Sequence, residues 1–91
     1  MKSILQTEKM CWYTGDVRDL HKHHIFGGSG NRKLSEKYGL WVWLRADKHT
    51  GPQGVHENRA LDLELKRAGQ EAFERTHSRE EFMRIFGRNW L

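Results

Sequence analysis

The stretch that decides the fold is Leu20–Phe26, which reads LHKHHIF. Two further histidines, His49 and His56, follow downstream. Five of the six histidines of the chain fall in these two regions. Imidazole is the commonest neutral metal ligand and the side chain that titrates nearest neutral pH. Two histidine regions separated by an apolar strand therefore predict a metal site with a general base beside it.

The composition limits the classes to which this chain can belong. Its 91 residues suffice for one domain, which we expect to span residues 1–91. Lysine and arginine outnumber aspartate and glutamate by 16 to 12, a mildly basic balance that permits phosphate contacts. The single cysteine, Cys11, excludes an intramolecular disulfide and a cysteine-rich zinc ribbon. The sequence has no long apolar run and no signal-peptide pattern, so we expect a cytoplasmic protein without a membrane helix.

The first part of the chain carries the signals of a small sheet. Residues 1–10 are weakly patterned, and we expect a flexible arm or an edge strand there. Aromatic residues followed by turn formers predict a strand over residues 11–16 that enters a turn. The histidine-rich stretch 20–26 is then predicted to be the second strand of a hairpin.

The rest of the chain combines one buried strand with helices. Residues 40–44 are continuously apolar and rich in β-formers, which predicts a buried strand. Over residues 55–75, apolar residues recur at three- and four-residue steps and predict a long helix. Ser78 and Glu81 match a capping box, which predicts a short final helix. The remaining predictions are a glycine-rich loop over 27–31, a helical turn over 34–38 with Ser35 as a candidate cap and Gly39 as its stop, and a polar loop over 47–54.

The order of these residues resembles the HNH, or ββα-metal, endonuclease superfamily. The resemblance is carried by the pair His23-His24, the apolar strand, His49 and the Gly-Val-His56 sequence, and it covers roughly residues 11–91. The runs over residues 31–40 and 54–58 also resemble those of small HNH-type proteins encoded by phages and prophages, some of which are described as RecA-dependent recombination nucleases. The resemblance implies an α+β fold with a ββα-metal core over residues 11–58 and a helical C-terminal part over 55–91, made of a long helix and a short one.

The resemblance also implies roles for the histidines. It makes His23, His49 and His56 ligands of one divalent ion, either Mg²⁺ or Mn²⁺, while imidazole ligands also suit Zn²⁺ or Ni²⁺. It makes His24 the general base, since adjacent strand residues point to opposite faces and cannot easily share one ion. His21 is expected to face solvent or to support a ligand. The basic residues expected to contact DNA phosphates are Lys22, Arg32, Lys33, Arg45 and Lys48.

Two features depart from the pattern of the superfamily. Many members bind a structural zinc through two Cys-x-x-Cys pairs, whereas Thr14 and Arg45 stand where further cysteines would be expected. The central asparagine of the HNH motif would fall near residues 38–39, which are not asparagine. Asn31 and Asn58 are the two candidates for its orienting role in catalysis.

The histidine pattern predicts a small metal-dependent nuclease. The resemblance implies, more specifically, an endonuclease that hydrolyses DNA phosphodiester bonds, encoded by a phage or prophage and acting in the bacterial cytoplasm. DNA is the expected partner, together with a second copy of the chain or a phage or host protein of recombination or packaging. Two alternatives stay open on the same scaffold. One is a module that binds nucleic acid without cutting it, and the other is a phage protein that binds a host factor.

Overall fold

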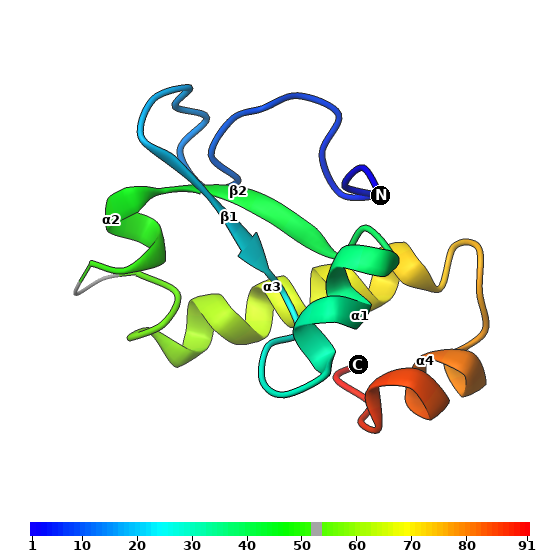
Figure 1. The fold of residues 1–91 in the computed structure, drawn as a ribbon. Coiled ribbons are helices and arrows are strands. Elements are labelled where there is room, and N and C mark those ends of the chain that lie inside the picture. Colours follow the sequence, from blue (N-terminus) through cyan, green and yellow to red (C-terminus); the bar gives the residue numbers. More distant parts are fainter. Residues whose placement is uncertain (52–53) are drawn as a thin grey trace.

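Two short antiparallel strands bring the two histidine regions together. The computed structural model describes residues 1–51 and 54–91. The class is α+β, as predicted, with two paired strands against a short helix, then a 15-residue helix and a short final helix (Figure 1). The elements follow in the order β1 (Leu20–His24), α1 (Asn31–Lys37), β2 (Trp41–Arg45), α2 (Ala46–His49), α3 (Arg59–Phe73) and α4 (Arg79–Phe86).

The register of the sheet gives neighbouring residues of β1 different surroundings. β1 pairs with β2 so that His23 lies opposite Val42 and His24 lies opposite Trp41. Because side chains alternate along a strand, His23 lies on the face that packs into the core and His24 lies on the opposite face. We call these the core face and the outer face. The core face also carries His21 and Leu44, and the outer face also carries Lys22 and Trp43.

The predicted strand over residues 11–16 is wrong, because the partner of β1 is β2, which follows α1. The preference of its turn-forming residues for a turn outweighs the preference of its aromatic residues for a strand. The Gly15 N–H donates to the Cys11 carbonyl at 2.9 Å, and Gly15 has a φ of 77°. One contact with the sheet remains, since the Trp12 N–H donates to the Trp43 carbonyl at 2.9 Å.

The first residues bind the edge of β2 that faces away from β1. They form neither a free arm nor a strand but a bent segment that reaches β2 with side chains. The Ser3 hydroxyl donates to the Trp41 carbonyl at 2.6 Å, and Gln6 Oε1 accepts the Trp43 N–H at 2.8 Å. Figure 1 shows this segment running beside β2.

α1 is longer than the predicted helical turn, because it begins at Asn31. Ser35 is not its cap: it lies inside the helix and is fully buried. The Ser35 hydroxyl accepts the Phe26 N–H at 3.1 Å and donates to the Phe26 carbonyl at 2.8 Å. These two hydrogen bonds fix α1 to the end of β1. Gly39, with a φ of 70°, follows the helix as predicted.

α3 and α4 complete the core. α3 begins at Arg59 instead of residue 55, because Asn58 Oδ1 accepts the N–H groups of the first helical turn. Gly69 lets α3 approach the end of β1 closely, since a Cβ there would lie 3.2 Å from Ile25 side-chain atoms. Ser78 caps α4 through the Glu81 N–H at 3.0 Å.

No helix in the described ranges is long and apolar enough to cross a membrane. The buried core includes Ile25, Phe26, Leu40, Val42, Leu44, Leu65, Phe73, Phe82 and Phe86.

Candidate metal centre

Three histidines from three segments converge. His23 comes from β1, His49 is the last residue of α2, and His56 lies before α3. Their ligand nitrogens all lie within 4.8 Å of one another, and 3.0 Å separates Nε2 of His49 from Nε2 of His56. Two nitrogens bound to one ion at about 2.1 Å lie about 3.0 to 3.4 Å apart in octahedral or tetrahedral geometry. The spacing of this pair therefore matches that of two ligands on one ion.

Local structure places His49 and His56 side by side. Part of the predicted polar loop over 47–54 is helical, since α2 follows β2 directly and ends at His49. The Val55 N–H donates to the Lys48 carbonyl at 2.7 Å, and the Val55 side chain is buried in the core. Gly54 permits this return, because a Cβ there would lie 3.0 Å from the Asp47 carbonyl oxygen. The chain thus brings His56 back to the end of α2.

His23 is the buried member of the cluster, with 5% of its surface exposed. Burial, and then the nearby His49 and His56, lower the pKa of His23 to about 3, so its ring is neutral at pH 7. Its Nε2 is buried and has no hydrogen-bond partner among the described residues. An unsatisfied buried nitrogen costs about 1 to 3 kcal/mol, and a bound cation would supply the missing partner.

His21 supports the cluster from the same face of β1. Its Nδ1 lies 3.1 Å from Nδ1 of His49, and the residue as a whole is exposed. His21 therefore faces solvent, as expected, and contacts His49, whereas its support of a metal ligand stays a prediction. When the His49 Nδ1–H donates to His21, the His49 Nε2 keeps the lone pair that binding a metal requires. Such outer hydrogen bonds orient histidine ligands in metal sites.

The donor set fits a divalent cation. Three neutral imidazoles suit Zn²⁺, Ni²⁺ and other first-row ions. His49 is half-buried and His56 exposed, so the cluster is open on the side of these two residues. Catalytic metal sites commonly combine three protein ligands with an open position of this kind. The cluster of His23, His49 and His56 can thus hold a metal ion and leave room for a further ligand.

His24 lies on the outer face and has a different partner. Its Nε2 lies 3.0 Å from Oε1 of Glu36, and the same oxygen accepts a hydrogen bond from Lys22 Nζ at 3.0 Å. We did not predict a role for Glu36. No spacing in the sequence pointed to it, because its approach to β1 depends on the anchoring of α1 by Ser35.

One cavity joins the two faces. Its volume is about 270 Å³, and both the histidine cluster and His24 line it. Of the residues predicted to contact DNA, Lys22 and Arg32 line this cavity, Lys33 is exposed on α1, and Lys48 is half-buried on α2. The other lining residues are His23, His49, His56, Gly27 and Gly28.

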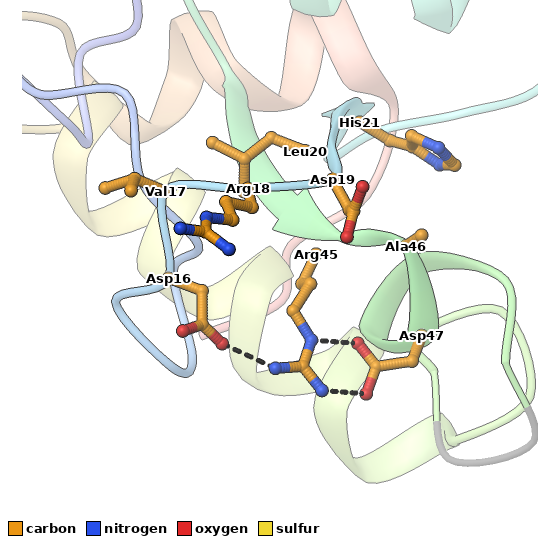
Figure 2. A pocket seen from close by; sticks show the side chains of 9 residues that line it. All are labelled: Asp16, Val17, Arg18, Asp19, Leu20, His21, Arg45, Ala46 and Asp47. Atoms are coloured by element: carbon orange, nitrogen blue, oxygen red, sulfur yellow. Dashed lines mark hydrogen bonds and ion pairs between the residues drawn. The ribbon is translucent and has the colours of Figure 1, made fainter.

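Arg45 lies in a different hollow, of about 730 Å³ (Figure 2). Its guanidinium donates to Asp16 at 2.6 Å and to both carboxylate oxygens of Asp47 at 2.7 and 2.9 Å. Hydrogen bonds from Arg45 hold the pKa of both carboxyl groups below the usual range. Although this hollow is larger, the three-histidine cluster lies elsewhere, so ligand chemistry and not size locates the candidate site.

The two candidate asparagines are placed differently. The Asn58 side chain caps α3, which uses its Oδ1 for the N–H groups of Ala60 and Leu61. Asn31 is the half-buried first residue of α1. The hydrogen bond of His24 within the described part of the chain goes to Glu36. An orienting role of either asparagine stays a prediction.

Comparisons of the chain with known protein families, with curated proteins and with solved structures find no match. The residues of the chain provide an α+β fold with a cluster of three histidines that can hold a metal ion.

Proposed function

We propose that the chain is a divalent-metal-dependent endonuclease of the HNH type that hydrolyses phosphodiester bonds in DNA. The observation that carries the proposal is the meeting of a three-histidine cluster and a separate histidine, His24, at one cavity. Phosphodiester hydrolysis needs an activated water, compensation of the phosphate charge and stabilisation of the leaving oxygen. The residues around this cavity can meet each need.

His24 is the proposed base. About 15% of its side chain is exposed, and it lines the cavity, so a water molecule there can reach its ring. A neutral imidazole can take the proton as the water oxygen attacks phosphorus. A divalent ion held by His23, His49 and His56 would stabilise the negative charge of the phosphate and of the leaving oxygen.

Cations at the cavity support a polyanionic substrate. Arg32 lines the cavity, where its side chain can orient a phosphate group, and Lys22, whose Nζ donates to Glu36, adds positive charge there. The net charge of +4 favours association with nucleic acid. DNA is the proposed nucleic acid because of the resemblance of the histidine pattern to HNH endonucleases.

A plasmid-nicking assay tests the proposal. Supercoiled plasmid is incubated with the protein and Mg²⁺, Mn²⁺, Zn²⁺ or Ni²⁺ in turn. We expect open-circular plasmid to form with at least one of these ions and no nicked product to form after a chelator is added. His24→Ala is expected to lower the rate by about 10²- to 10⁴-fold without loss of metal binding. His77→Ala is the matched control, because His77 stacks on Phe73 outside the cavity.

The outcomes separate the proposed function from its alternatives. Absence of nicking with all four ions overturns the proposal. If the protein then still binds a fluorescent DNA duplex, and His24→Ala binds it equally well, the chain is a module that grips nucleic acid without cutting. Nicking that His24→Ala preserves would also contradict the assigned mechanism.

A further inference from the structure

We propose that Glu36 positions His24 for its role as base, an inference that rests on the function proposed above. Oε1 of Glu36 lies 3.0 Å from Nε2 of His24. An ionised carboxylate can only accept hydrogen bonds, so Nε2 must carry a proton in this contact. In the neutral ring the lone pair is then on Nδ1. Glu36 thereby fixes both the orientation of the ring and the nitrogen that can take a proton from water.

The residue before Glu36 ties this part of α1 to the ends of both strands. The preceding residue, Ser35, is fully buried and hydrogen-bonded to both backbone groups of Phe26. The Ser35 carbonyl in turn accepts the Leu40 N–H at 2.8 Å, next to the start of β2. Groups that orient a reacting side chain act best from rigid elements of this kind. The backbone from which the Glu36 side chain reaches β1 is therefore held in a fixed position.

Lys22 keeps the Glu36 carboxylate charged. Residues 22 and 24 share the outer face of β1, so both reach the same carboxylate oxygen. Lys22 Nζ also lies 4.1 Å from the centre of the Trp41 ring, which holds the ammonium group between two partners. Hydrogen bonds from His24 and then from Lys22 hold the pKa of Glu36 below its usual range. The carboxylate is therefore ionised at neutral pH.

Two substitutions of Glu36 test the inference. Glu36→Ala removes the acceptor, whereas Glu36→Gln keeps an amide oxygen that can still accept the Nε2 proton. We expect Glu36→Ala to lower kcat by about 10- to 100-fold, with Glu36→Gln in between, while KM changes by no more than about twofold. Mn²⁺ affinity, measured by calorimetry, should not change. Glu71→Ala, on the exposed face of α3, is the control.

A spectroscopic readout separates positioning from a structural role. In the assigned proton NMR spectrum of the metal-free protein, the carboxylate should shift the His24 Nε2–H downfield and slow its exchange with water. That signal should disappear in Glu36→Ala and persist in Glu71→Ala.

Each outcome has a distinct meaning. Unchanged kcat in Glu36→Ala, where His24→Ala lowers the nicking rate as expected, overturns the inference and leaves the proposed function standing. A parallel loss of Mn²⁺ affinity also overturns it, because Glu36 would then act on the fold of the histidine cluster. If Glu36→Ala fails to fold, Glu36→Gln decides the question through its kcat and its Nε2–H signal. A parent protein that cleaves with no metal overturns the proposed function itself.

Discussion

The two faces of β1 differ in what they bury and in what their histidines contact. On the core face, His23 is buried and neutral, and it meets His49 and His56. On the outer face, His24 keeps part of its ring exposed and meets a carboxylate. The two residues are adjacent, so the alternation of the strand alone separates them. The difference shows how five residues of strand can supply both a cation ligand and a proton acceptor at one cavity.

Removing one of the three proposed ligands should have the largest effect. His49→Ala takes away the nitrogen that lies 3.0 Å from His56 Nε2 and the link to His21. We expect calorimetry to show Mn²⁺ or Zn²⁺ affinity more than about 100-fold weaker than in the parent, beyond the loss typical of outer-shell changes. His77→Ala should bind like the parent. Equal affinity of His49→Ala and the parent would mean that the three rings do not share one ion.

Substitutions on the two faces should differ in how much they lower the free energy of unfolding. Leu44 is fully buried on the core face, so Leu44→Ala should lower the free energy of unfolding by about 2 to 5 kcal/mol. Lys22→Ala removes a partly exposed ion pair on the outer face and should cost about 1 kcal/mol or less. Urea unfolding of both variants measures the contrast. Similar losses would show that the outer face is as much a part of the core as the other.

The neutral His23 should make the metal-free protein sensitive to acid. Its pKa of about 3 in the folded state lies below the unfolded value of 6.5, so between these values the unfolded chain binds a proton that the folded protein does not. Stability therefore falls as pH falls, by up to about 1.4 kcal/mol per pH unit. The lowered pKa of His49 acts in the same direction.

Urea unfolding with chelator at pH 6.5, 5.5 and 4.5 measures this slope before most carboxylates protonate. His23→Leu removes the titrating ring and should flatten the slope. An equally steep slope in His23→Leu would assign the acid sensitivity to other groups.

His21 should have a smaller effect on metal binding than a ligand. His21→Ala removes the partner of His49 Nδ1 but none of the three converging nitrogens. We expect metal affinity to fall by about 10- to 100-fold and the plasmid-nicking rate at saturating metal to change little. Calorimetry and nicking measured together test this. A loss as large as that of His49→Ala would indicate that His21 is itself a ligand.

Substitutions of Asn58 should have the smallest effect, and they separate its role as a helix cap from the predicted orienting role in catalysis. Asn58→Ala removes the cap of α3 and should cost about 0.5 to 2 kcal/mol, whereas Asn58→Asp keeps an accepting oxygen and should cost less. If Asn58 only caps the helix, both variants should nick plasmid at the parental rate below their melting temperatures. A cleavage defect in a folded Asn58→Asp protein would instead support the predicted orienting role.

Local patterns in the sequence predicted β2 and the two C-terminal helices, because each depends on neighbouring residues. The strand predicted over 11–16 failed because Gly15 and the residues around it favour a turn. The start of α3 was placed too early, since Asn58 had not been recognised as its cap.

For the candidate site, too, the sequence predicted some features and could not predict others. The alternation of His21 and His23 was visible in the sequence, and His23, His49 and His56 were predicted to converge, as they do. The contact of His24 with Glu36 could not be predicted, because it depends on a buried serine that fixes a helix to a strand.

The side chains of Ser3 and Gln6 have a consequence beyond the site. A two-stranded sheet with a bare edge is a template on which another chain can add a strand. Along β2 that addition is blocked, because these two side chains and the Trp12 amide already occupy backbone groups of the strand. Substituting Ser3 and Gln6 by alanine should therefore promote aggregation through β2 while the histidine cluster stays intact.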